Sequence, residues 1–195
     1  MNEQSLKSEK QLKTPFQGSL LKILPYAGIP VFAALLPVIR AGKPELLSLL
    51  CDELLIVFGY VLTVSDLKSK RIPNSAVLAM LAAWALIVLP QVFIDTRQSV
   101  KLLIDSAIGS AVGGGLFLLV YIISRKGLGG GDVKFMAVAG LYLGYGSILP
   151  AMFCGTLLAM LTGIALILTK KIRRQDTIPL VPFLFAGILI ALYFR

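Results

Sequence analysis

The 195-residue sequence contains no histidine, and its two cysteines, Cys51 and Cys154, lie far apart in apolar segments. Zinc and haem sites draw mainly on imidazole and thiolate ligands. With no histidine and no pair of neighbouring cysteines, the sequence predicts neither a metal site nor a bound cofactor. The two thiols are expected to act as small packing residues.

Charge is also scarce, because only 15% of the residues are charged while 57% are hydrophobic. The mean hydropathy is +0.86, and a soluble domain of this length could not bury so much apolar surface. A helix needs roughly 20 apolar residues to cross a bilayer. The sequence therefore predicts an all-α, polytopic membrane protein with six to seven transmembrane helices. The seven candidate spans are Leu20–Ile39, Leu46–Ser65, Ser75–Ile94, Leu102–Ser124, Val133–Leu149, Ala151–Thr169 and Ile178–Phe194.

The first candidate span is the weakest, because Pro25, Pro30 and Pro37 interrupt it. If this segment lies on the membrane surface, six spans remain. Residues 1–19 are polar and lack the apolar core of a cleavable signal peptide. We therefore expect a cytoplasmic tail over residues 1–19 and one membrane-embedded domain over residues 20–195.

The distribution of basic residues predicts the orientation. With a cytoplasmic N-terminus and seven alternating spans, 14 of the 19 lysines and arginines lie inside and 5 lie outside. Cytoplasmic loops of membrane proteins carry such an excess. The formal net charge of +9 then indicates contact with anionic membrane lipid, and nucleic-acid binding is not expected.

Two aspartates carry polar motifs in this apolar sequence. Asp66 closes the second apolar segment and precedes the loop Arg71-Ile72-Pro73-Asn74, in which the proline stops one helix and Asn74 or Ser75 can cap the next. Considered alone, Asp66 is equally compatible with a simple membrane boundary. The basic side chains of this loop are compatible with an anchor at the cytoplasmic surface.

Asp132 follows the three glycines at positions 129–131. Glycine permits extended or positive-φ backbone and the close approach of another chain, so this stretch could pair with a peptide as an added strand. Alternatively, Asp132 caps the next helix and the glycines form a hinge. The turn Gly144-Tyr145-Gly146 ends that helix only 12 to 14 residues later, roughly 18–21 Å. Asp132 is therefore expected to lie below the membrane surface, where a carboxylate is costly unless it faces a wet cavity.

Two apolar segments separate Asp66 from Asp132, so the chain returns to the same side and both carboxylates can meet there. Two carboxylates that share a proton can hydrolyse a peptide bond, one as general base to water and the other as general acid. By contrast, Asp52 and Asp105 fall near the outer ends of their spans, where structural roles are expected.

These motifs resemble the type IV prepilin peptidases, a family of GxGD-type membrane aspartic proteases. The resemblance runs from Leu54 to the C-terminus and includes Ile178-Pro179-Leu180-Val181-Pro182-Phe183. It implies Asp66 and Asp132 as the catalytic pair. It implies substrate binding or motif support for seven more residues, namely Gly129, Gly130, Gly131, Lys134, Arg71, Pro73 and Asn74.

The same resemblance implies cleavage of the basic leader of prepilin-like substrates, which carry a transmembrane helix, at the cytoplasmic face of the bacterial inner membrane. Bifunctional relatives carry paired CxxC motifs and methylate the new N-terminus. Residues 1–53 contain no such pair, so a shorter, peptidase-only form is expected. The alternative is a small transporter or proton channel that uses intramembrane carboxylates. Such proteins often contain an internal repeat, and none is apparent in this sequence.

Overall fold

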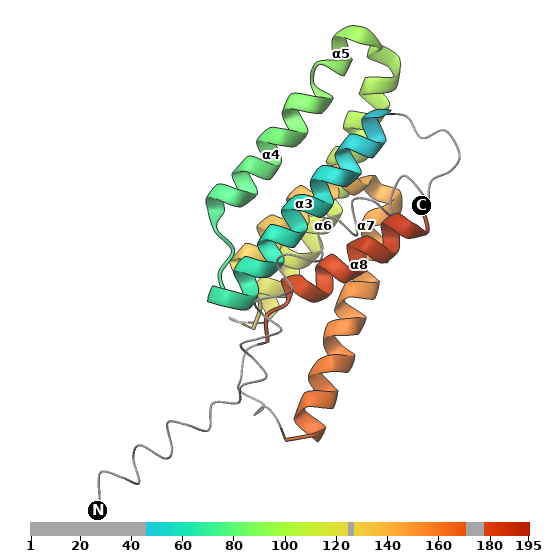
Figure 1. Cartoon of the computed structure of the whole chain (residues 1–195). Coiled ribbons are helices and arrows are strands. Elements are labelled where there is room, and N and C mark those ends of the chain that lie inside the picture. Colours follow the sequence, from blue (N-terminus) through green and yellow to red (C-terminus); the bar gives the residue numbers. More distant parts are fainter. Residues whose placement is uncertain (1–45, 125–126, 171–177) are drawn as a thin grey trace, which may run out of the picture.

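The computed structural model describes residues 46–124, 127–170 and 178–195, and its secondary structure there is entirely helical, which confirms the all-α part of the predicted fold class. The predicted tail 1–19 and the first predicted span, Leu20–Ile39, lie outside the described residues. The helices are α3 (Leu46–Ser69), α4 (Asn74–Val88), α5 (Gln91–Ile94), α6 (Thr96–Ile123), α7 (Gly130–Leu168) and α8 (Val181–Tyr193) (Figure 1).

Four stretches of the described residues are long and apolar enough to cross a membrane: α3, α4 with α5, α6 and α7. The last helix, α8, is also apolar but has only 13 residues. The protein is therefore multi-pass, although the described residues show four such stretches rather than the predicted six to seven. Helix α6 begins before the predicted Leu102, because the Asp95 carboxylate accepts a hydrogen bond from the Gln98 N–H and caps its first turn.

Helix α7 breaks at Gly144, where the sequence predicted a turn. Gly144 has a φ of 67° and a ψ of 179°, a backbone conformation that suits glycine alone. The chain reverses direction at this break. The evidence is that the Met136 carbonyl and the Ile148 side chain, twelve residues apart, both lie against Gly113 of α6. The break falls earlier than the boundary expected between Leu149 and Ala151. It divides α7 into a first half of 14 residues and a second half of 24.

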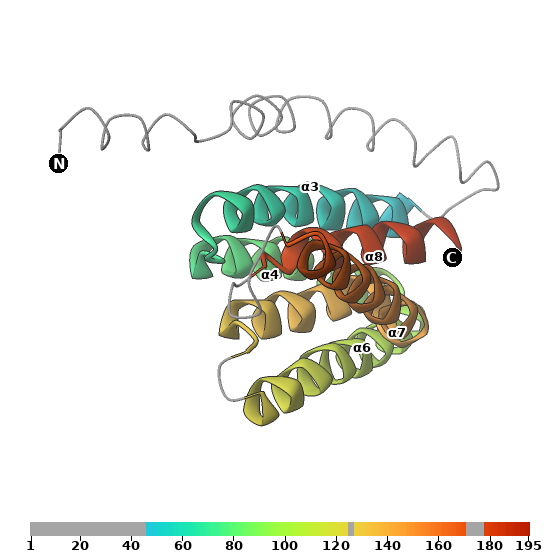
Figure 2. The same ribbon diagram turned by 90° about the horizontal axis from the view of Figure 1, so that it is seen from below.

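The first half of α7 lies between α6 on one side and α3, α4 and α8 on the other (Figure 2). Close packing against α6 depends on Gly109 and Gly113, whose spacing of four residues is typical of close contacts between membrane helices. A Cβ atom on Gly109 would collide with the Gly140 carbonyl oxygen, and one on Gly113 would lie 2.6 Å from the Met136 carbonyl oxygen. No larger residue fits at these positions without moving a helix.

Two hydrogen bonds attach α4 to the first half of α7. The Trp84 indole N–H donates to the Leu141 carbonyl over 3.1 Å, and the Tyr142 hydroxyl donates to the Met80 carbonyl over 2.6 Å. All of these side chains except that of Leu141 are buried. Trp84 therefore both packs in the core and donates a hydrogen bond from its indole N–H. The helix that begins beside Asp132 is thus fixed from both sides.

Candidate active site

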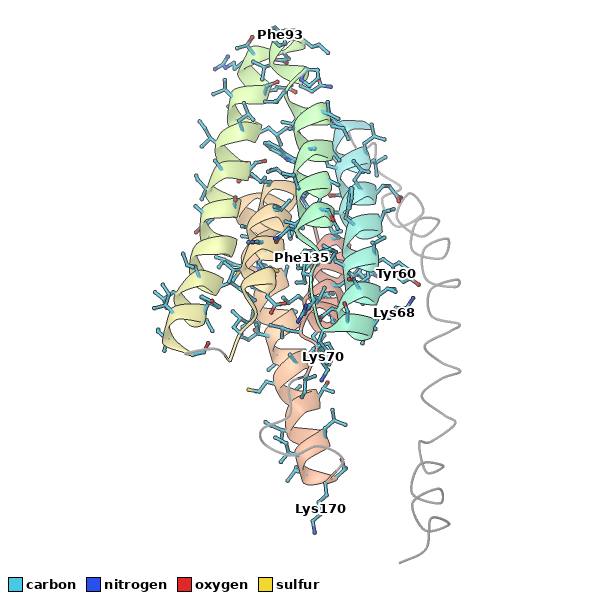
Figure 3. All side chains as sticks on the ribbon, turned by 90° about the vertical axis from the view of Figure 1, so that its left-hand side faces the viewer. Tyr60, Lys68, Lys70, Phe93, Phe135 and Lys170 are labelled. Atoms are coloured by element: carbon cyan, nitrogen blue, oxygen red, sulfur yellow. The ribbon has the colours of Figure 1, made fainter. Side chains whose placement is uncertain are left out.

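Asp66 lies in the last turn of α3, which continues past the predicted boundary at Ser65 to Ser69. Its side chain is buried, with 6% of its surface exposed. The Lys70 N–H still donates to the Asp66 carbonyl over 2.8 Å. The helix ends there because Lys70 adopts a φ of 50°. This left-handed conformation is uncommon for a residue other than glycine and is enriched at functional sites. Figure 3 shows Lys70 at this end of the bundle and Phe93 at the opposite end.

Asp132 lies in the first turn of α7, where Gly129 is the N-cap residue. Its Oδ2 accepts a hydrogen bond of 3.1 Å from the Gly129 N–H, and 8% of its surface is exposed. Asp132 therefore stabilises the start of the helix from inside it, rather than from the N-cap position. Such a side chain satisfies one of the N–H groups that a helix start leaves unpaired.

The glycines before Asp132 do not form the extended strand that their composition permitted. Only Gly129 is extended, with φ −77° and ψ 137°, whereas Gly130 and Gly131 begin α7. The expected close approach does occur, but it is made by this chain itself. A Cβ atom on Gly131 would lie 2.8 Å from Cβ of Ile72 and 3.1 Å from its Cδ1. Gly131 thus lets the loop after Asp66 pack directly on the helix that carries Asp132.

A hydrogen bond also joins the two motifs. The Lys134 ammonium group donates to the Asn74 side-chain oxygen over 3.0 Å. The sequence predicted Asn74 or Ser75 as the cap of the next helix. That prediction is wrong for Asn74, because α4 begins at this residue, Pro73 precedes it as the N-cap and the helix start has no side-chain cap. The amide of Asn74 serves instead as a link between the loop and α7.

The segment before α8 supplies the third part of the site. The Val181 N–H, at the start of α8, donates to Oδ2 of Asp66 over 3.2 Å. The partial positive charge of a helix N-terminus favours an anion at this position. Pro182, in the first turn of α8, has no N–H to leave unpaired there. The sequence showed this segment only as part of the family resemblance and did not predict its bond to Asp66.

Asp66 and Asp132 line one cavity of about 310 Å³, and they are close enough to interact electrostatically. The rest of the lining comes from the end of α3, from the loop before α7 and from the segment before α8: Lys70, Gly127, Leu128, Gly129, Ile178, Pro179 and Leu180. The charge of Lys70 acts on Asp66. The cavity therefore combines two carboxylates, one ammonium group and room for water.

The structure separates the predicted site residues into two groups. Asp66, Asp132 and Gly129 line the cavity, whereas Arg71, Pro73, Asn74, Gly130, Gly131 and Lys134 are not among its lining residues. Arg71 contributes its carbonyl oxygen to the turn, where the Ser65 hydroxyl donates to it over 3.1 Å. Lys70 was missed because it reads as one of several loop cations. Its position four residues after Asp66 was the available signal, since such residues lie on the same side of a helix end.

Asp52 and Asp105 lie away from this cavity. Asp52 is fully buried and lies 3.7 Å from the guanidinium group of Arg195. Oδ1 of Asp105 accepts a hydrogen bond of 3.2 Å from the Tyr145 N–H, and its carboxylate touches Gly144 at the reversal of α7. Both contacts agree with the structural roles that the sequence predicted. Within the described residues, no group of three or more potential metal ligands is found.

The sequence profile of the type IV leader peptidases matches residues 54–168, which include both aspartates, the loop after Asp66 and most of α7. The chain belongs to the type IV leader peptidase family. This is a family of membrane aspartic peptidases, so the membrane helices, the cavity and the resemblance noted in the sequence agree. No solved structure matches the chain.

Three curated relatives are named prepilin leader peptidase/N-methyltransferase. The protein of Bacillus subtilis is 33% identical over 84 residues, covering 43% of this chain and 34% of its own length. That of Escherichia coli is 26% identical over 162 residues, covering 80% and 67%. That of Pectobacterium carotovorum is 31% identical over 130 residues, covering 64% and 43%. The chain thus spans only about a third of the Bacillus protein, and the relatives' names give no support to the expected loss of methyltransferase activity.

Proposed function

We propose that this protein is an aspartic endopeptidase that removes the leader peptide from prepilin-like precursors, with Asp66 and Asp132 as the catalytic pair. The observation that carries the proposal is their position on one cavity, where each carboxylate accepts a hydrogen bond from a backbone N–H. Membership of the leader peptidase family favours this function over the transporter or channel alternative.

The chemistry follows from the shared cavity. One carboxylate, ionised, takes a proton from water as the water oxygen attacks the scissile carbonyl carbon. The other, protonated, donates a hydrogen bond to the carbonyl oxygen and then supplies the proton that the departing amine requires. Two nearby carboxylates reach this mixed state because ionising both is costly. Each aspartate accepts a backbone N–H, but only Asp66 also has the positive charge of Lys70 acting on it. Asp66 is therefore the better candidate for the base.

The substrate class rests on the family and on charge. A precursor with a basic leader and a transmembrane helix can place a cleavage site near one end of that helix beside the cavity. The 14-to-5 split of basic residues supports a cytoplasmic N-terminus and a cytoplasmic site, in a bacterial inner membrane. No cofactor is part of this mechanism, since the water is activated by carboxylate alone.

Co-expression with a prepilin-like precursor from the same genome tests the proposal. We expect leader removal by the wild type, and its loss in Asp66→Asn and in Asp132→Asn, with wild-type levels of protein in the membrane. The double variant is expected to be no worse than either single one, because the pair acts as a unit. Cleavage is also expected to survive EDTA. Normal processing by either single variant, or EDTA inhibition reversed by zinc, contradicts the mechanism.

The same experiment can settle methylation, because the mass of the processed N-terminus is measured. Cleavage alone gives the free amine, whereas an added methyl group increases its mass by about 14 Da. The names of the three relatives make this measurement necessary. The cavity geometry supports the peptidase activity, and the mass of the processed N-terminus tests for methylation.

A further inference from the structure

Helix α8 is attached to α3 at both ends by polar contacts. At one end, the Val181 N–H donates to Asp66 over 3.2 Å. At the other, the Arg195 guanidinium group lies 3.7 Å from Oδ1 of Asp52. The two aspartates are fourteen residues apart on α3, and Val181 and Arg195 are also fourteen residues apart. Fourteen helical residues extend roughly 21 Å, so the antiparallel helices meet at both ends in one register.

A third contact lies between these two. Gly59 is seven residues from each aspartate, and the ring of Phe185 rests against it, so closely that a Cβ atom there would lie 2.6 Å from Cδ2 of the ring. Asp52 has 1% of its side chain exposed and Arg195 has 33%. The ion pair is therefore not a surface pair of the kind that contributes little. Loss of the Arg195 cation removes a counter-charge from this buried carboxylate, which is destabilising.

We propose that Asp52 and Arg195 are positioning residues, whose ion pair fixes the register of α8 on α3 and thereby holds the Val181 N–H on the Asp66 carboxylate. The effect on cleavage rests on the proposed function, whereas the effect on the Val181 N–H does not. A shift of α8 along α3 by part of a turn would remove the donor from Asp66. The site would then lose the group that stabilises its ionised form, although no residue of the cavity had changed.

Hydrogen exchange of the Val181 amide, in the full-length protein in lipid nanodiscs, measures the register directly. We expect Arg195→Gln to accelerate this exchange about tenfold, the equivalent of a hydrogen bond to a charged group, and to lower kcat with little change in KM. Arg195→Lys should restore most of both. The matched control is Arg97→Gln, which removes the same charge from an exposed position near the same end of the bundle and should change neither.

Asp52→Asn guards against a failure of Arg195→Gln to insert, because it changes almost no volume. We expect it to accelerate Val181 exchange in the same direction, and the double variant Asp52→Asn/Arg195→Gln to be no worse than Arg195→Gln alone. Val181 exchange equal to that of the control in both single variants overturns the proposal. Faster exchange with unchanged kcat overturns its link to catalysis. A wild type that cleaves no precursor refutes the proposed function, while the exchange data still decide the register.

Discussion

Gly130 and Gly131 are adjacent in sequence, yet the structure predicts opposite results when each is replaced by alanine. Both lie in the first turn of α7. A Cβ atom on Gly131 would lie 2.8 Å from Cβ of Ile72, and two more atoms of that side chain are within 3.2 Å. A Cβ atom on Gly130 would meet only the Tyr121 ring, at 4.0 Å. The sequence alone suggested that either substitution would reduce turnover through lost flexibility.

The magnitudes follow from two opposing effects. Alanine in place of glycine stabilises a helix by up to about 1 kcal/mol, which is the whole effect expected at Gly130. Overpacking a well-filled site costs about 1–3 kcal/mol, and this cost applies at Gly131 only. We therefore expect Gly131→Ala to be less stable than Gly130→Ala by about 1–3 kcal/mol. At about 2–4 °C per kcal/mol for a chain of this size, thermal unfolding in detergent resolves the difference.

Cleavage of a co-expressed precursor is the second assay for this pair. Displacing Ile72 from the start of α7 moves the helix turn that carries Asp132, so Gly131→Ala should lose turnover while Gly130→Ala retains it. Equal unfolding midpoints for the two variants, or a Gly131→Ala enzyme with full activity, would refute the packing argument. Loss of activity in both, with unchanged stability, would instead favour the hinge that the sequence suggested.

Two further predictions concern orientation and the reversal of α7. Ser69 and Thr96 are both exposed, at opposite ends of the bundle, and each can be replaced by a single cysteine. Ser69→Cys should be labelled from the cytoplasm and Thr96→Cys from outside. Labelling of Ser69→Cys only from outside contradicts the proposed topology. Asp105→Asn keeps an oxygen that can accept from the Tyr145 N–H and should retain most stability, whereas Asp105→Leu should cost about 1–3 kcal/mol; equal unfolding midpoints for these two variants would show that the bond does not hold the reversal.

The sequence predicted the parts of the site that depend on counting and on local chemistry. An even number of apolar segments between Asp66 and Asp132 indicated that they could meet, and they line one cavity. The glycine at position 144 marked the break in α7, because a positive φ has a recognisable residue preference. The spacing of Gly109 and Gly113 likewise marked a close helix contact.

The parts that the sequence did not predict depend on distant backbone. The Val181 N–H and Asp66 are 115 residues apart in the sequence. Every residue except proline has a backbone N–H, so no side chain indicates which one will form this bond. Gly130 and Gly131 permit helix and strand alike, so their helical conformation and the close contact of Gly131 with Ile72 could not be predicted from these residues alone. Asn74 was assigned a local role as a cap because short polar residues often cap helices. Its partner, Lys134, lies on another helix.

The unequal halves of α7 bear on how deep in the bilayer a peptide bond would be cleaved. The second half has ten residues more than the first, roughly 15 Å of helix, and in Figure 1 it continues past the ends of α3 and α6. If Lys170, just after the end of α7, lies at the level of the lipid headgroups, the two aspartates lie below that level. They are then at the depth of the hydrocarbon layer. A peptide there cannot obtain hydrogen bonds from bulk water, and each unpaired backbone group costs several kcal/mol. A substrate of the proposed kind would therefore need its peptide backbone to find hydrogen-bond partners inside the enzyme once its helix unwinds at the cavity.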